Sequence, residues 1–358
     1  MNFLFIVQGE GRGHLTQSIA LNDMLTESGH EVVAVMVGKS NRRKDLPAFF
    51  VEKFGRKIRR FDSPNFLPAS KNRKTVIWTS IAYNVLRSWK YMRSVLIIRN
   101  SISRRNVDVV VNFYELLTGL SYAVLPPKKP CFCVAHQYIF LHPEFNFPKV
   151  NSVELKGLKF FTKVTCLRAA GLLALSVRPM DNVPEIGLTV VPPLLRKEVF
   201  NTEVKDGDYL NGYILNDNYA EEIIGFHENH PDVKMHFFWD KKDVEEETVV
   251  GSGNLTFHRL NDKLFIEYMS GCKAYVTTAG FESVCEAMFM GKPVLVVPTH
   301  IEQQCNAFEI SEAGAGVTAD RFEIEKLFLF IPTFQKNTEF CDWVKSANRY
   351  FPYILMKS

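Results

Sequence analysis

A glycine turn, a carboxylate and an acid-amide pair follow one another between residues 273 and 306. The apolar run 274–276 predicts a buried strand, residues 278–280 predict a tight turn, and a helix follows with Ser283 and Glu286 on one face. Unpaired N–H groups at the start of such a helix suit a diphosphate. A carboxylate that accepts from two vicinal hydroxyls suits a ribose.

Glu302 and Gln303 lie just past a second apolar strand, residues 294–297, which Pro298 ends. In open α/β sheets, ligands bind outside the carboxyl ends of strands. The segment therefore predicts a nucleotide-sugar pocket. The alternative is an ordinary βαβ unit with polar residues on its surface.

The segment resembles the C-terminal signature of GT-B glycosyltransferases, both the plant-type UDP-glycosyltransferases and the lipid-linked N-acetylglucosaminyltransferase of peptidoglycan synthesis (family 28-like). The resemblance implies that Glu286 holds the ribose, that residues 278–280 hold the diphosphate, and that Glu302 and Gln303 hold the donor sugar. The plant-type enzymes have a histidine where Thr278 stands, so this phosphate contact would come from a hydroxyl or from backbone. The matching positions are Gly280, Ser283, Glu286, Gly291, Pro293, Pro298, Glu302, Gln303 and Asn306. The predicted donor-binding residues are Gly13, Asn216, His258, Thr278, Ala279, Gly280, Phe281, Ser283, Glu286, Glu302 and Gln303.

The amino terminus predicts a second βαβ unit. Residues 3–7 form an apolar strand, a glycine loop leads to Gly13 and His14, a helical pattern follows, and residues 31–37 form the next strand. The loop spacing G-x-G-x-G is not the dinucleotide fingerprint, and no acidic residue closes the second strand. The pattern therefore disfavours a dehydrogenase.

This loop resembles the glycine-histidine loop at the start of GT-B enzymes, where the histidine faces the inter-domain cleft. Arg12 replaces a family glycine and would charge the acceptor side. A neutral imidazole at His14 could accept a proton from an acceptor hydroxyl; the alternative is a helix-capping histidine. We expect Glu115, and after it Glu10, as the carboxylate that orients the base.

His136 and Gln137 follow another predicted strand and resemble the His-Glu-Gln-Asn segment of the peptidoglycan enzyme. They are predicted to contact the acceptor, with Arg12, unless they belong to a solvated loop.

Length and composition fit two domains, because 358 residues with 46% hydrophobic content can form two cores. The predicted fold is α/β, with two Rossmann-like domains whose parallel sheets face a central cleft. We expect an acceptor domain at 1–190, a linker at 191–207 and a nucleotide-sugar domain at 208–334. The apolar spacing in the last stretch, 335–358, predicts a helix. The resemblance to GT-B proteins implies that this helix crosses back to the first domain; the alternative is the core packing of an ordinary terminal helix.

Basic residues concentrate between Lys39 and Arg105, where 18 lysines and arginines stand against three acids and are interleaved with aromatic residues. Such a mixture suits an anionic membrane surface. It also suits nucleic acid, which we consider an improbable partner here, or an ordinary solvated face. Charges interrupt every apolar run well before about 20 residues, so contact with a bilayer would be peripheral.

Metal and disulfide chemistry are not predicted. Asp206 and Asp208 form a D-x-D pattern, but they precede a strand, where a solvated turn is expected. Seven scattered cysteines indicate reduced, buried thiols and a cytoplasmic protein. The opening residues lack a basic n-region and are expected to form a strand and not a signal peptide.

The sequence therefore predicts a metal-independent, inverting glycosyltransferase that needs no cofactor beyond its UDP-sugar donor. His14 and Glu115 are the predicted catalytic residues. The acceptor would be a glycan, a glycolipid or a small molecule, and the enzyme would be cytoplasmic or peripheral at the inner face of the membrane. Two alternatives remain: a UDP-sugar 2-epimerase, which would convert donor without acceptor, and a binding protein without turnover.

Overall fold

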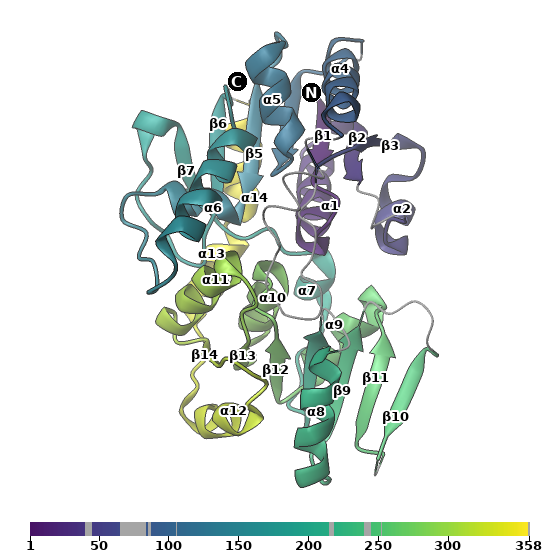
Figure 1. The fold of residues 1–358 in the computed structure, drawn as a ribbon, viewed down its shortest axis with the longest axis vertical. Helices are drawn as coiled ribbons and strands as arrows, with labels where there is room; N and C mark the ends of the chain where they lie inside the picture. Colours follow the sequence, from purple (N-terminus) through teal and green to yellow (C-terminus); the bar gives the residue numbers. More distant parts are fainter. Residues whose placement is uncertain are drawn as a thin grey trace. The chain divides into compact units, whose positions relative to one another are not determined.

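The computed structural model describes residues 1–39, 45–64, 84, 87–104, 106–214, 218–239, 245–251 and 253–356. The chain divides into two compact units, each with a seven-stranded sheet between layers of helices (Figure 1). This confirms the predicted α/β class. Unit 1 comprises Met1–Asn146, Asn151–Leu194 and Lys345–Ser358, and unit 2 comprises Phe147–Val150 and Leu195–Val344.

The sheet of unit 1 has the order β3-β2-β1-β4-β5-β6-β7, and every neighbouring pair is parallel. Its central strands are continuous buried apolar runs, as expected for a sheet covered on both faces. The strand order reverses between β1 and β4, so the loops after these strands meet at one edge. The strands are β1 (Asn2–Val7), β2 (Glu31–Lys39), β3 (Ile58–Asp62), β4 (Val109–Phe113), β5 (Cys131–Ala135), β6 (Gly171–Leu175) and β7 (Leu188–Val191).

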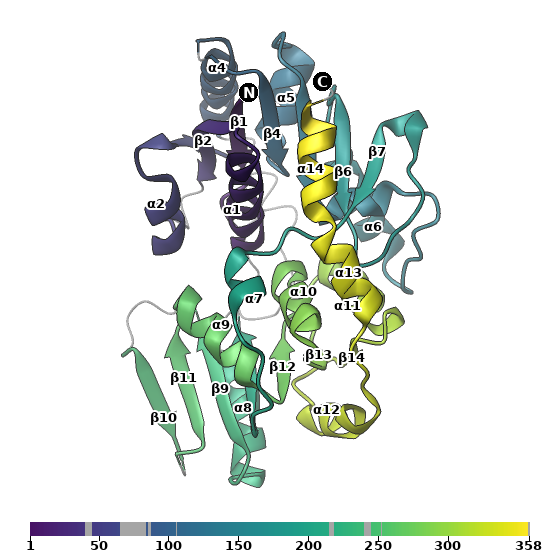
Figure 2. The ribbon, with the colours of Figure 1, turned by 180° about the vertical axis from the view of Figure 1, so that it is seen from behind.

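Helices cover both faces of this sheet. The C-terminal helix α14 lies against α1 and β7 (Figure 2), while α5 packs between α4 and α6 on the other face. The single helix expected near the C-terminus is in fact two, α13 and α14. The helices of unit 1 are α1 (Arg12–Glu27), α2 (Ala48–Phe54), α4 (Ser88–Arg104), α5 (Leu116–Val124), α6 (Ser152–Thr165) and α14 (Ala347–Met356), with 3-10 turns η1 (Gly55–Lys57), η2 (His136–Leu141) and η3 (Pro184–Ile186).

The sheet of unit 2 has the order β10-β11-β9-β8-β12-β13-β14, with only the edge strand β10 antiparallel to its neighbour. Its strand order reverses between β8 and β12. The strands are β8 (Tyr209–Ile214), β9 (Lys234–Trp239), β10 (Glu247–Val250), β11 (Leu255–Arg259), β12 (Ala274–Thr277), β13 (Val294–Val296) and β14 (Gly316–Thr318). The helices are α7 (Lys197–Asn201), α8 (Asn218–Asn229), α9 (Asp262–Gly271), α10 (Phe281–Met290), α11 (Ile301–Glu312), α12 (Ile324–Phe330), η4 (Ile331–Thr333) and α13 (Thr338–Lys345).

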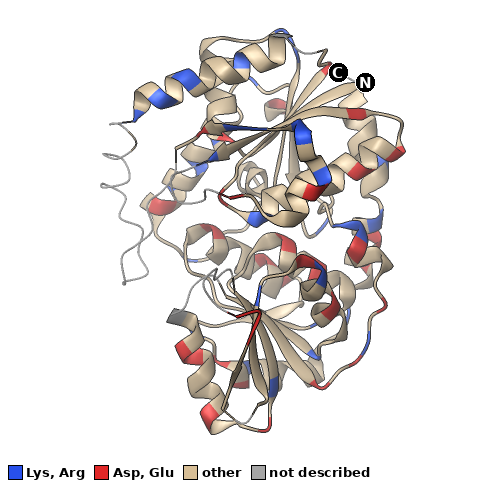
Figure 3. Cartoon of the chain, turned by 90° about the vertical axis from the view of Figure 1, so that its right-hand side faces the viewer, with Lys and Arg blue, Asp and Glu red and all other residues tan. Residues whose placement is uncertain are grey.

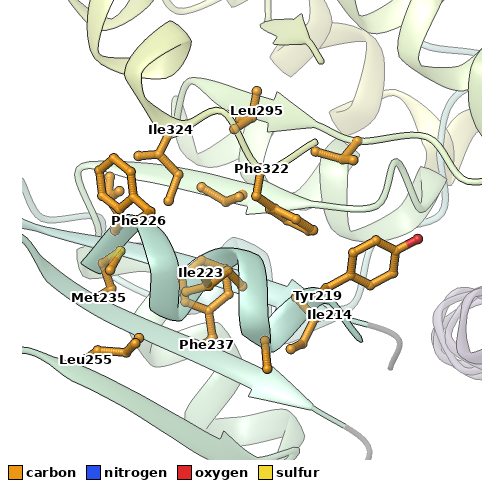
Figure 4. Packing of buried hydrophobic residues seen from close by; sticks show 14 of the residues in the cluster. Ile214, Tyr219, Ile223, Phe226, Met235, Phe237, Leu255, Leu295, Phe322 and Ile324 are labelled. Atoms are coloured by element: carbon orange, nitrogen blue, oxygen red, sulfur yellow. The ribbon is translucent and has the colours of Figure 1, made fainter. Parts of the chain in front are cut away.

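The two faces of the unit 2 sheet differ in polarity. Under α8 and α12 lies an apolar cluster that includes Ile223, Phe237, Leu295 and Ile324 (Figure 4). Side chains alternate between the faces of a strand, so the intervening positions point to the opposite face, where α9 and α10 pack. Asn211 is one of several buried polar residues there.

Candidate functional site

The loop between β1 and α1 in unit 1 is shaped by Gly9. A Cβ atom at Gly9 would collide with the backbone carbonyl of Gly38 at the end of β2, so only glycine fits this close approach. The helix α1 begins at Arg12 with Gly11 as its N-cap. Gly13 and His14 therefore lie in the first turn of α1, whereas the sequence pattern predicted them at the end of the glycine loop.

His14 is buried against Tyr114, with 5.6 Å between the ring centroids. Its Nδ1 lies 3.2 Å from Oε1 of Gln17, an atom that can only accept, so Nδ1 donates. In this tautomer Nε2 is the acceptor nitrogen of the ring. Tyr114 has a φ of 59°, an uncommon conformation outside glycine, and its hydroxyl is 2.7 Å from that of Thr162.

Glu115 follows β4 and caps α5, where its carboxyl accepts from Leu117 N at 3.2 Å. Ser63 Oγ donates to the same oxygen at 2.6 Å. Burial, opposed by these hydrogen bonds and aided by the charge of Glu10, raises the pKa of Glu115 to about 7. These hydrogen bonds hold the Glu115 carboxyl against Ser63 and the start of α5. The dyad stays a prediction.

His136 and Gln137 begin the turn η2 after β5, and both side chains are buried. Nδ1 of His136 donates to the carbonyl of Leu175 at 2.8 Å. The structure thus ties this histidine to β6, the neighbouring strand, and a solvated loop does not describe it.

In unit 2 the turn after β12 is held by a distant amide. Ala279 has a φ of 49°, and Asn306 on α11 donates to its carbonyl at 3.1 Å. The neighbouring Gly280 has an ordinary φ of −70° as the N-cap of α10. A Cβ at Gly280 would come no closer than 3.7 Å to another group, Ser283 Oγ, so nothing within the described chain requires a glycine there.

Several of the other predicted donor residues lie near this turn. Thr278 and Phe281 are buried, and Gln303 Oε1 accepts from both the N–H and the hydroxyl of Thr299, at 2.9 and 2.8 Å. Glu302 is partly exposed in the first turn of α11. The structure therefore brings the residues of 278–286 and 302–306 together on neighbouring elements of one unit.

Glu286 on α10 is paired with an arginine. Arg196 Nε and Nη2 donate to its two carboxylate oxygens at 2.8 and 2.9 Å, and both side chains are buried. Arg196 Nη1 lies 3.7 Å from Asp262 on α9. We expected Arg196 only as part of a connector. One indication in the sequence that Arg196 is buried was its position directly after two prolines and two leucines.

His258 is a member of β11, and its ring lies in a cluster with another histidine and two aromatic residues. Its Nε2 lies 3.0 Å from Nδ1 of His236, and Phe238 and Tyr268 contact the ring. Burial lowers the pKa of His236 to about 4. Asn216, the remaining predicted donor residue, lies outside the described residues.

Other expectations concern metals, thiols and membranes. Asp208 accepts from Lys234 at 2.6 Å, as a solvated turn residue would, and no cluster of three metal-binding side chains occurs in the described part of the chain. All seven cysteines are free, and six are buried. Within the described ranges, no helix is both long and apolar enough to cross a bilayer.

Solved structures similar to this chain are GT-B glycosyltransferases, which confirms the predicted fold. This chain is similar to Medicago truncatula UGT71G1 complexed with UDP-glucose, with a TM-score of 0.64 and 13% sequence identity. The similarity covers 99% of this chain and 98% of UGT71G1. It is also similar to Arabidopsis thaliana UGT89C1 complexed with UDP-L-rhamnose, with a TM-score of 0.59 and 14% sequence identity. That similarity covers 99% of this chain and 97% of UGT89C1.

Curated relatives match a short segment. Mogroside IIIx synthase of Siraitia grosvenorii is 45% identical over 47 residues, 13% of this chain and 10% of the relative. A putative UDP-glucuronosyltransferase, ugt-48 of Caenorhabditis elegans, is 35% identical over 54 residues, 15% of this chain and 10% of the relative. The matched segments thus span about a tenth of these relatives. The family model described as glycosyl transferase family 1 matches residues 1–334, and the chain therefore belongs to this family.

Proposed function

We propose that the protein transfers a sugar from a UDP-sugar to an acceptor hydroxyl. The observation that carries the proposal is the β12–α10 turn, in a chain of glycosyl transferase family 1. Gly280 has ordinary backbone angles and no neighbour that would exclude a side chain. A glycine in such a place leaves room for a ligand to approach the backbone, and a diphosphate suits the helix start beside it.

The donor would lie along the carboxyl ends of β12 and β13. The first turn of α10 offers backbone N–H groups and the positive end of the helix dipole to the diphosphate. Glu286 would accept from the ribose hydroxyls, and Glu302 and Gln303 would contact the sugar. Similar proteins are named as complexes with UDP-glucose and UDP-L-rhamnose, which supports uridine as the base.

The chemistry would be inverting and would need no metal. His14 Nε2 accepts the proton of the acceptor hydroxyl while the oxygen forms a bond to the anomeric carbon. The bond from this carbon to the phosphate oxygen breaks on the opposite face, and UDP leaves with the electron pair. The N–H groups of α10 stabilise the negative charge that develops on the diphosphate.

Titration calorimetry with UDP, TDP and GDP tests the donor assignment. We expect wild type to bind UDP selectively and Glu286→Ala to bind it more weakly, because the ribose loses its acceptor. Failure of wild type to bind any of the three nucleotides would refute the proposal.

A second variant tests the base. His14→Ala should lose transfer of sugar from radiolabelled UDP-sugar by about 10²–10⁴-fold, the usual contribution of a general base. Its affinity for UDP should match wild type, because the proton is taken from the acceptor. Unchanged turnover would remove His14 from the mechanism.

A membrane-associated acceptor is supported by the outer face of α4 and α6. Both helices pack on α5, and their exposed residues include Trp89 and Phe160, which are 63% and 70% exposed. Residues Ser88–Arg104 of α4 contain no acid, and lysine and arginine positions, blue in Figure 3, recur along this helix. Exposed aromatic groups beside lysine and arginine are typical of surfaces that bind anionic lipid.

Sedimentation with phosphatidylglycerol vesicles tests this surface. We expect binding at low salt that is lost at high salt, and weaker binding after Trp89→Ser or Phe160→Ser. Leu329→Ser is the matched control, because Leu329 is 78% exposed but belongs to α12 of unit 2. Absence of binding at low salt would contradict the membrane proposal and leave the donor proposal intact.

A further inference from the structure

Arg196 and Glu286 form a buried ion pair within unit 2. Their side chains are 9% and 2% exposed, although 90 residues separate them in the sequence. Arg196 directly precedes α7, and Glu286 lies midway along α10. Buried arginines and glutamates occur almost only as pairs. The contact between the two side chains therefore compensates for the burial of both charges.

The geometry of the pair leaves acceptor capacity on Glu286. An ionised carboxylate offers about four acceptor positions, and the two N–H donors of Arg196 use one on each oxygen. One acceptor position on each oxygen therefore remains. Two vicinal ribose hydroxyls could each use one.

Arg196 is itself fixed from a second side. Its Nη1 lies 3.7 Å from Asp262, so the guanidinium sits between two carboxylates. Burial would lower the pKa of Arg196, but the charges of Glu286, Asp262 and Glu198 outweigh it and raise the pKa. The guanidinium is therefore a permanent cation with a set orientation.

We propose that Arg196 is a positioning residue for the donor site, which holds the Glu286 carboxylate in the plane in which it receives the two ribose hydroxyls. The inference rests on the proposed function. It also defines the donor class, since a site built on this pair selects ribonucleoside diphosphates over their 2′-deoxy counterparts.

The opposite possibility is displacement, in which ribose takes the carboxylate edge that Arg196 occupies and the guanidinium turns to Asp262. The two arrangements predict opposite effects. Loss of Arg196 weakens ribose recognition if the residue positions Glu286, and it tightens UDP binding if the residue competes with ribose.

The experiment compares the affinities of the full chain for UDP and 2′-deoxy-UDP by calorimetry. Hydrogen bonds to charged groups correspond to roughly 10- to 100-fold in affinity, so we expect wild type to prefer UDP by about tenfold or more. In Arg196→Gln the ratio should fall toward one. Arg196→Lys should give an intermediate ratio, because an ammonium cannot form the two-pronged contact.

The matched control is Arg259→Gln, which removes an arginine from an exposed pair in the same unit, 3.1 Å from Glu246. This variant should keep the wild-type ratio. Glu286→Gln should show the same reduced ratio of affinities as Arg196→Gln. The double variant should show no further reduction, because the two residues contact each other and recognise the ribose together.

Each outcome decides a separate question. The positioning role is overturned if Arg196→Gln keeps the wild-type preference for UDP over 2′-deoxy-UDP, or if this variant binds UDP more tightly than wild type. If Arg196→Gln fails to fold by circular dichroism, Arg196→Lys decides in its place, and an undiminished ratio in the folded lysine variant overturns the role. Failure of wild type to bind UDP refutes the proposed function itself.

Discussion

At the scale of single residues, Glu115 is a carboxyl group placed where water cannot reach it. Burial raises its pKa from an ordinary 4.5 to about 7. Between these two values the folded protein binds a proton that the unfolded chain has released. Stability therefore falls as the pH rises through this window and stays low above it.

Glu115→Gln should remove this pH dependence, because an amide does not ionise. The free energy of unfolding of wild type should decline by on the order of 3 kcal/mol relative to the variant between pH 4.5 and 7, since each pKa unit corresponds to about 1.4 kcal/mol. Urea unfolding at several pH values measures the difference. A difference that is constant with pH would show that Glu115 is ionised in the folded state.

Residues also mark the limit of what the sequence reveals. The turn at 278–280 was predictable, because an apolar strand, a glycine and a helical pattern follow one another locally. The left-handed Ala279 was not, since its partner Asn306 lies 27 residues away. Arg196 pairs across 90 residues and was missed for the same reason: pattern reasoning reads neighbours along the chain and not contacts between elements.

At the scale of elements, two helical glycines in unit 1 have opposite surroundings. Gly119 on α5 faces the backbone carbonyl of Val164 at the end of α6, and a Cβ there would collide with it. Gly157 on α6 has nothing within 4 Å of such an atom. Gly119 is needed for the close packing of the two helices, whereas Gly157 only lowers the stability of its helix relative to alanine.

Alanine at each position should therefore move stability in opposite directions. Gly157→Ala should stabilise the protein by about 0.5–1 kcal/mol, the usual helix preference for alanine. Gly119→Ala should destabilise it by roughly 1–3 kcal/mol, because a backbone carbonyl cannot rotate away. Thermal or urea unfolding of the pair measures both. Equal effects of the two substitutions would contradict this account of α5–α6 packing.

At the scale of the whole molecule, the chain begins and ends in the same unit. Residues 1–146 open unit 1, unit 2 follows after residue 194, and α14 returns to pack on α1 and β7. The sequence predicted a C-terminal helix from its apolar spacing. Which surface that helix covers depends on the folded sheet, so spacing alone could not specify its contacts.

Removal of residues 347–358 should consequently weaken unit 1 in particular. Phe351 and Leu355 on α14 are fully buried, and each contributes about 1.5–3 kcal/mol by leaving water. Hydrogen–deuterium exchange should then show faster exchange in β1 and β4, with β8 and β12 unchanged. Because Glu286, Glu302 and Gln303 of the proposed donor site all belong to unit 2, the truncated protein should bind UDP as wild type does.

A point variant separates the effect of lost side-chain packing from the effect of removing the whole C-terminal helix. Phe351→Ala should reproduce much of the truncation, at a cost of about 3–5 kcal/mol for a buried phenylalanine, whereas Tyr353→Ala, at a half-exposed position on the same helix, should change little. Faster exchange in β8 and β12 in either Phe351→Ala or the truncated protein would mean that the two units unfold together. UDP affinity would then depend on α14 through the stability of the entire chain, and donor binding could no longer be assigned to unit 2 alone.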